Sequence, residues 1–154
     1  EIHERLVGSE MCIRDRLVNA TDYMRRRISN KVQLMTHLPE EPIGGMYCLP
    51  LLEWVIENLC KNAIDAMDGE GSIDVSLQAD KDKCYIDVRD TGKGIPRKRF
   101  KTVFNPGYTT KKRGWGLGLT LVKRIIEEYH EGRIYVKESE PGKGTTFRIE
   151  LKRS

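Results

Sequence analysis

The sequence of 154 residues lacks any apolar run long enough to cross a membrane. A membrane helix needs about 20 consecutive, mostly apolar residues, and the longest candidate, residues 46–60, is broken by Pro50 and two glutamates. The first residues, EIHERLVG, also lack the apolar stretch of a secretion signal. We therefore expect a cytoplasmic location for this chain, even if the full-length protein carries a membrane anchor elsewhere.

Cysteine motifs and a dominant charge are absent as well. The four cysteines form no CxxC pattern, so we expect small buried thiols in a reducing compartment rather than a zinc site or a disulfide framework. The 27 Lys and Arg residues exceed the 23 Asp and Glu residues by only four, which does not indicate a nucleic-acid partner. A chain of this length can bury on the order of two-thirds of its unfolded surface, enough for one packed core.

The spacing of apolar residues predicts an α+β fold. A period of 3.6 predicts helices over residues 15–29, 50–67 and 117–130. Alternation predicts strands over residues 31–38, 72–79, 84–88, 133–136 and 145–151. The last four strands read as two antiparallel hairpins. Helices collected on one face of a mixed, mostly antiparallel sheet form a two-layer sandwich.

The helix predicted over residues 50–67 carries a polar stripe beside its apolar face. At 100° per residue, Asn58, Asn62 and Asp65 lie within about 60° of one another. One interpretation is a solvated helix edge. The other is a set of oxygen ligands facing a cleft, which suits Mg²⁺ because this ion prefers a few protein oxygens completed by water and phosphate.

Two glycine motifs lie downstream of this helix. In DTGKGI, Asp90 ends a strand and could accept a hydrogen bond from an exocyclic amine such as that of adenine, although a simple turn would look the same. In GWGLGL, residues 114–119, alternating glycines lead into a helix and would offer backbone N–H groups to phosphate oxygens, unless they form a hinge. Residues 90–116, which run from the first motif into the second, have no predicted regular element beyond one or two helical turns near residues 96–103. So long a loop is unusual in a compact domain, and we expect it to be mobile.

In this order and spacing, the motifs resemble the catalytic ATP-binding domain of sensor histidine kinases. Its Bergerat fold is shared with gyrase-type, Hsp90-type and MutL-type ATPases, the GHKL superfamily. The resemblance covers about residues 30–151. The matching segments are the N box at 58–66, the first glycine box at 90–95, the lid motif at 104–111 and the second glycine box at 114–119.

The resemblance implies roles for individual residues, with ATP and Mg²⁺ as ligands. Asn62 would ligate Mg²⁺ with Asn58 beside it, and Lys61 and Lys111 would stabilise the γ-phosphate; these four are the implied catalytic residues. Asp90 would accept from the adenine amine, with Thr145 or Thr146 helping. The full implied nucleotide-binding set is Asn58, Asn62, Asp65, Asp90, Gly92, Gly94, Ile95, Phe104, Tyr108, Thr109, Thr110, Lys111, Gly114, Gly116, Leu117, Gly118, Leu119, Thr145 and Thr146.

Position 58 favours phosphoryl transfer over hydrolysis. Hydrolysing members of the superfamily carry Glu four residues before the Mg²⁺-binding Asn, whereas this chain has the amide Asn58, which cannot act as a base. Glu57 would point about 100° away and is the weaker candidate. The implied function is transfer of the γ-phosphoryl of Mg-ATP to a histidine. The alternatives are an ATPase of the GHKL type, or a nucleotide-binding module that docks a partner through Arg25, Arg26 and Arg27.

The family's acceptor motif, a His followed by an acidic residue and a nearby Pro or Asn, has no match here. We interpret His3 as a surface residue, and His130 as a cation suited to a helix end. The acceptor would lie on a separate dimerisation domain of the same protein, with 17–29 as the end of its helix and 30–154 as the ATP-binding domain. Residues 7–16 resemble a translated sequencing adaptor, so we treat 1–16 as a leader without functional weight. The implied partners are that domain and a response regulator receiver, with a homodimeric full-length protein and a monomeric fragment.

Overall fold

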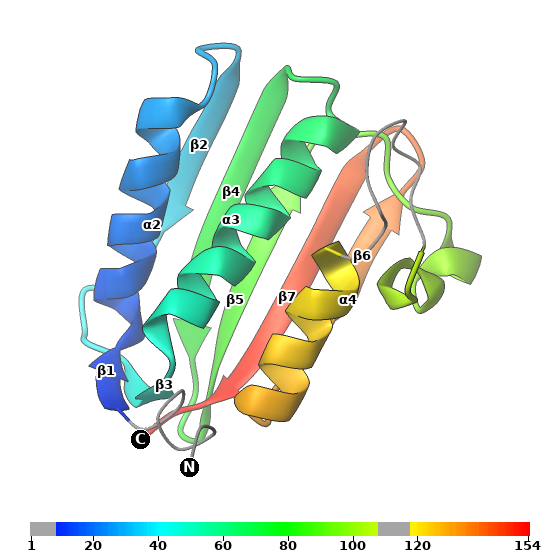
Figure 1. The fold of residues 1–154 in the computed structure, drawn as a ribbon. Coiled ribbons are helices and arrows are strands. Elements are labelled where there is room, and N and C mark those ends of the chain that lie inside the picture. The colour runs from blue at the N-terminus through cyan, green and yellow to red at the C-terminus, as the bar shows by residue number, and fades with distance from the viewer. Residues whose placement is uncertain (1–8, 108–117) are drawn as a thin grey trace.

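A five-stranded sheet covered on one face by three helices forms the protein (Figure 1). The structure is a computed structural model that describes residues 9–107 and 118–154. The helices are α2 (Ile13–Arg27), α3 (Leu49–Ala66) and α4 (Gly118–Arg124), which continues as the π-helical turn η3 (Ile125–Tyr129). The sheet strands are β2 (Val32–His37), β4 (Gly71–Ala79), β5 (Lys83–Asp90), β6 (Arg133–Glu140) and β7 (Gly144–Lys152). The predicted two-layer α+β class is confirmed.

The strand order in the sheet is β2-β4-β5-β7-β6. Only β2 and β4 run parallel; β4–β5, β5–β7 and β6–β7 are antiparallel, so both predicted hairpins are confirmed. The apolar face of α3 packs on the centre of the sheet because its buried residues recur with the helical period. These residues are Leu52, Val55, Ile56, Leu59, Cys60 and Ala63.

The sequence pattern missed a second, two-stranded sheet. In it β1 (Ser9–Cys12) pairs antiparallel with β3 (Gly44–Tyr47). Two glycines made β3 read as a loop, and a strand of four residues is too short for alternation to be seen. Two short 3₁₀ turns, η1 (Arg97–Arg99) and η2 (Thr102–Phe104), follow the glycine loop after β5, where one or two helical turns were expected.

The packing of α2 continues without a break across the domain boundary expected at residue 30. Leu17 is 2% exposed, and Ala20 and Met24 are 5% exposed, all within the same core as the sheet. Ile13, inside the segment that we treated as a leader, is buried there too. Helix α2 is therefore an integral part of the layer that covers the sheet (Figure 1).

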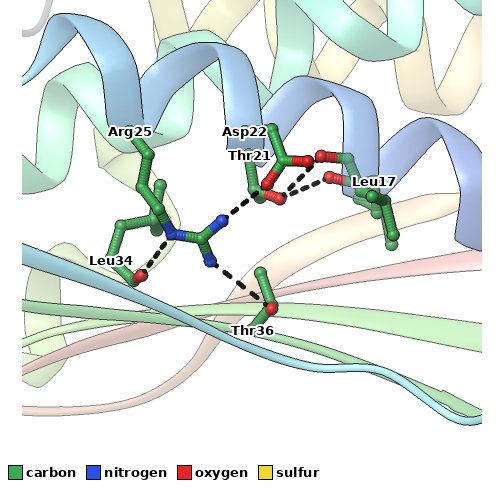
Figure 2. A network of polar contacts seen from close by, with 7 residues as sticks. Leu17, Thr21, Asp22, Arg25, Leu34 and Thr36 are labelled. Carbon is green, nitrogen blue, oxygen red and sulfur yellow. Dashed lines mark hydrogen bonds and ion pairs between the residues drawn. The ribbon is translucent and has the colours of Figure 1, made fainter.

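Arg25 ties the end of α2 to the edge strand β2 (Figure 2). Its Nε donates to the carbonyl oxygen of Leu34 over 2.9 Å, and its guanidinium also forms an ion pair with Asp22 and a long hydrogen bond to Thr36. This residue is thus engaged within the chain. Of the three cations of the expected docking surface, Arg25, Arg26 and Arg27, Arg25 is therefore the one with contacts to β2.

All four cysteines are free thiols, as expected. Cys48, Cys60 and Cys84 are buried and Cys12 is half-buried. Burial raises the pKa of the Cys60 thiol to about 12, so this side chain is an apolar filler of the core. No helix of the described residues is long and apolar enough to span a membrane.

His130 is a buried, neutral residue, and its interpretation as a helix-end cation is wrong. Its Nε2 accepts a hydrogen bond from the backbone N–H of Cys48 over 3.0 Å, so this nitrogen carries no proton. Its Nδ1 therefore carries the ring proton and donates to the carbonyl oxygen of Ile125 over 2.9 Å. Cys48 is the N-cap residue of α3, so the ring joins the start of α3 to the end of η3.

We expect His130→Ala to lower the free energy of unfolding by about 3 kcal/mol, because it leaves the buried backbone N–H of Cys48 without its acceptor and opens a cavity. Urea unfolding followed by circular dichroism measures this loss. His37→Ala is the control, since His37 is 59% exposed and has only a surface ion pair with Asp74, worth less than about 1 kcal/mol. Equal losses in the two variants would contradict the bridging role of His130.

Candidate functional site

The centre of the candidate site is Asp90, the last residue of β5. The residue is 4% exposed, and its Oδ1 accepts hydrogen bonds from the backbone N–H groups of Gly92 (2.8 Å) and Thr145 (3.3 Å). No described residue donates to Oδ2, and no fully buried side-chain oxygen among the described residues lacks a partner, so Oδ2 reaches the surface. Burial raises the pKa of Asp90, and the two backbone donors oppose that rise. The site thus presents one free carboxylate oxygen.

The loop after Asp90 is held between two other parts of the fold. On one side, the N–H of Lys93 donates to the carbonyl oxygen of Ala66 at the end of α3 (2.9 Å). On the other, the N–H of Gly142 donates to the carbonyl oxygen of Lys93 (2.7 Å). Gly94 has φ +79°, and a Cβ there would overlap the carbonyl oxygen of Glu140. Only glycine fits this position. The sequence predicted that the backbone passes close to a ligand here, and in the structure it passes close to the backbone of Glu140.

Strand β7 brings Thr145 to this carboxylate. The backbone N–H of Thr145 donates to Asp90, and its hydroxyl lies 2.7 Å from that of Ser139. Thr146 pairs with Arg89 in the ladder and, because side chains alternate along a strand, points to the opposite face of the sheet. Of the two threonines that the sequence left open, the structure places Thr145 beside Asp90.

The predicted amide stripe lies on the side of α3 that meets α4. Asn58 and Asn62 are half-buried and Asp65 is exposed. A Cβ on Gly118, the first residue of α4, would lie 2.9 Å from Oδ1 of Asn58, so the start of α4 packs directly on this amide. The stripe and the end of the second glycine box therefore adjoin.

Lys61 is not brought to this stripe. With Glu57 it lines a cavity of about 430 Å³ between α2 and α3, which Tyr23 and Arg27 also line. This cavity lies on the α2 side of the helix, whereas Asn58 lies on the α4 side. Lys61 and Asn58, both implied catalytic residues, therefore lie on different sides of α3.

Phe104, which the sequence assigned to the lid motif, is a buried residue of the hydrophobic core. It is buried, its ring meets that of Phe147 edge-on with centroids 6.0 Å apart, and its carbonyl oxygen accepts from the Thr120 hydroxyl of α4 (2.9 Å). Leu119 also packs against the core. The remaining expected residues lie outside the described part of the chain: Tyr108, Thr109, Thr110, Lys111, Gly114, Gly116 and Leu117.

Sequence analysis did not identify two side chains that bind the glycine loop, those of Thr91 and Ser139. The Thr91 hydroxyl accepts from the N–H of Ser72 in β4 (3.1 Å) and contacts the sulfur of Met67. The Ser139 hydroxyl accepts from the N–H of Ile95 (2.7 Å). Thr91 stands inside DTGKGI and could have been suspected, whereas Ser139 lies in a strand without any motif.

Comparisons with known proteins agree with this geometry. Residues 49–154 match the sequence model of the family described as histidine kinase-, DNA gyrase B-, and HSP90-like ATPase. Sporulation kinase E of Bacillus subtilis (strain 168) is 44% identical over 124 residues, which cover 79% of this chain and 16% of that protein. The chain therefore spans about one sixth of the length of this relative.

Solved structures share the fold over more than nine-tenths of this chain. The nucleotide-free catalytic domain of histidine kinase ThkA superposes with a TM-score of 0.84 at 25% identity, covering 94% of this chain and 95% of that one. ThkA in complex with the response regulator protein TrrA gives a TM-score of 0.81 at 23% identity, covering 95% of this chain and 42% of that one, and shows the fold alone. This chain belongs to the family of histidine kinase-, DNA gyrase B- and HSP90-like ATPases, as a catalytic ATP-binding domain of the histidine kinase type.

Proposed function

We propose that this domain binds Mg-ATP and donates the γ-phosphoryl group to a histidine on a separate domain of the same protein. The observation that carries the proposal is the free Oδ2 of Asp90, an acceptor fixed at the mouth of a clamped glycine loop. Adenine offers an exocyclic amine as the matching donor. Buried carboxylates held by backbone donors make charge-assisted hydrogen bonds, which are about twice as strong as neutral ones.

The donor set on α3 fits Mg²⁺. Asn62 and Asn58 offer amide oxygens on the side of α3 that meets the start of α4, and Mg²⁺ accepts one or two protein oxygens with phosphates and water completing its shell. Asn62 would hold the ion. When bound, Mg²⁺ neutralises part of the charge on the transferring phosphates. Phosphate contacts from Gly116, Leu117 and Gly118, and closure by Thr109, Thr110 and Lys111, complete the proposed site.

The structure supports transfer over hydrolysis. A hydrolase needs a base near the attacking water. Asn58, where hydrolysing relatives carry Glu, is an amide, and the nearest carboxylate along the helix, Glu57, lines the cavity on the α2 side of α3. Water activation by either residue is thus disfavoured, whereas an incoming histidine brings its own nucleophilic nitrogen.

The proposed partners are the dimerisation domain that carries the acceptor histidine and a response regulator receiver. The structure of ThkA with TrrA supports the second of these partners by analogy. We also propose that α2 belongs to the ATP-binding domain rather than to the dimerisation helix, because its apolar face packs into the common core. A full-length homodimer would then join through residues outside this core.

A phosphotransfer assay tests the function. Radiolabelled ATP and a separately produced dimerisation domain should give label on that domain that is stable in base and lost in acid, as expected of phosphohistidine. Asn62→Ala should reduce this labelling by about 100-fold, since the Mg²⁺ ligand is lost. Asn19→Ala, at an exposed position on α2, is the control. Steady phosphate release without acceptor would support an ATPase instead, and ATP binding without labelling would support a docking module.

A further inference from the structure

The hydroxyl of Ser139 lies where three parts of the candidate site meet. The N–H of Ile95, from the glycine loop, donates to it over 2.7 Å. The hydroxyl in turn lies 2.9 Å from the carbonyl oxygen of Gly144 and 2.7 Å from the hydroxyl of Thr145, both in β7. One side chain thus links the glycine loop after β5 to the strand that holds Thr145 beside Asp90.

The hydrogen-bond partners indicate the direction of each proton in this cluster. Because the carbonyl oxygen of Gly144 can only accept, we assign the single proton of Ser139 to it. The 2.7 Å contact between the two hydroxyls is then made by the proton of Thr145, which donates to Ser139. Oγ1 of Thr145 has used its proton and keeps only lone pairs. Thr145 already contacts Asp90 through its backbone N–H. Its Oγ1 is therefore a second atom near Asp90, besides Oδ2, that can only accept.

A β-bulge in β6 turns Ser139 toward this site. Ile134 and Val136 point into the core, and an uninterrupted strand would place the next inward side chain at residue 138. The register shifts between Val136 and Glu138, so that Glu138 pairs with Thr146 and Ser139 pairs with Thr145. The extra residue moves the inward set from even to odd positions, a known use of bulges.

We propose that Ser139 is a positioning residue that makes the site select a purine with a hydrogen-bond donor at carbon 6. The inference rests on the proposed binding of ATP and deepens it. Ser139 holds the proton of Thr145, so Oδ2 of Asp90 and Oγ1 of Thr145 both face the base as acceptors. The amine of adenine satisfies such a pair, whereas the carbonyl of hypoxanthine or guanine is repelled by it.

The test compares the affinities of ATP and inosine 5′-triphosphate, which carries a carbonyl in place of the amine. In Ser139→Ala the Thr145 hydroxyl is free to turn and donate to that carbonyl. We expect the ratio of the two affinities to fall by about tenfold, the worth of one hydrogen bond, with ATP binding weakened and inosine triphosphate binding unchanged or improved. Ser139→Thr, which keeps the hydroxyl, should restore the ratio.

Ser76→Ala in β4 is the matched control, because Ser76 makes no side-chain hydrogen bond among the described residues. An unchanged ratio in Ser139→Ala, including equal weakening of both nucleotides, would assign Ser139 a merely structural role and overturn the inference. Failure of the unmodified protein to bind either nucleotide would instead overturn the proposed function itself. Isothermal titration calorimetry at fixed Mg²⁺ distinguishes these results.

Discussion

Asp90→Asn is expected to weaken ATP binding by about 100-fold, or about 2.7 kcal/mol, without unfolding the protein. Asparagine has the same shape, and its Oδ1 can still accept from the backbone N–H groups of Gly92 and Thr145. At the second position, however, an NH₂ group replaces the free oxygen. A donor then faces the donor amine of adenine, so the variant loses the attraction and gains a repulsion. Isothermal titration calorimetry measures the change directly.

The same substitution should stabilise the ligand-free protein at neutral pH. Because burial raises the pKa of Asp90, the folded state binds the proton more tightly than the unfolded state does. Between the unfolded pKa of 3.8 and the raised folded pKa, the folded state carries more protons, so stability falls as pH rises through that window. The variant does not titrate. Its advantage in unfolding free energy should be absent below pH 3.8 and fully present above the folded pKa.

Asp74→Asn is the control for both effects. Asp74 lies on β4 and makes an exposed ion pair with His37, so this variant should keep its ATP affinity. If Asp90→Asn bound ATP as tightly as the unmodified protein, Asp90 would not be the base acceptor. If its stability advantage were independent of pH, the ionised carboxylate would not be the destabilising group.

Gly144→Ala is expected to cost about 3 kcal/mol of unfolding free energy and to abolish ATP binding. Gly144 has φ +111°, and a Cβ there would overlap the carbonyl oxygen of Asp90. The overlap is with backbone, which cannot rotate away as a side chain can. The β6–β7 turn must therefore move off β5, and this movement displaces Thr145 from Asp90.

Gly142→Ala separates backbone strain from this collision. Gly142 lies in the same turn with φ +80°, but a Cβ there would meet no atom within 4 Å. Gly142→Ala should lower the free energy of unfolding by only about 1 kcal/mol, because alanine is strained in a left-handed conformation. It should leave ATP binding intact. Urea unfolding and calorimetry of the two variants provide the comparison. Equal losses would show that conformational strain, rather than contact with Asp90, governs this turn.

The sequence predicted the large elements well because burial imposes a period on long segments. Helix α3 buries Leu52, Val55, Ile56, Leu59 and Ala63 as its spacing indicated. Asp90 and Gly94 were identified because they stand in a compact motif. The β1–β3 pair escaped because four residues carry too little pattern, and because pairing between distant segments leaves no local trace.

The site was harder to predict where tertiary contacts decide the direction of a side chain. Lys61 follows Cys60 on the same helix as Asn58, yet its surroundings include α2, which no spacing rule specifies. Ser139 faces the site only because a bulge shifts the alternation of β6. The charge of His130 depended on a backbone N–H group 82 residues away in sequence. Each of these features arises from the packing of elements against one another.

The contact of Arg25 with Leu34 has a consequence for how the protein behaves at high concentration. Strand β2 has a partner on one side only in the described sheet, and open strand edges invite pairing with other chains. The guanidinium of Arg25 donates to the carbonyl oxygen of Leu34 in this strand, so an incoming strand would approach a positive charge (Figure 2). We therefore expect this helix residue to disfavour pairing at the sheet edge, as lysines on edge strands do in other proteins.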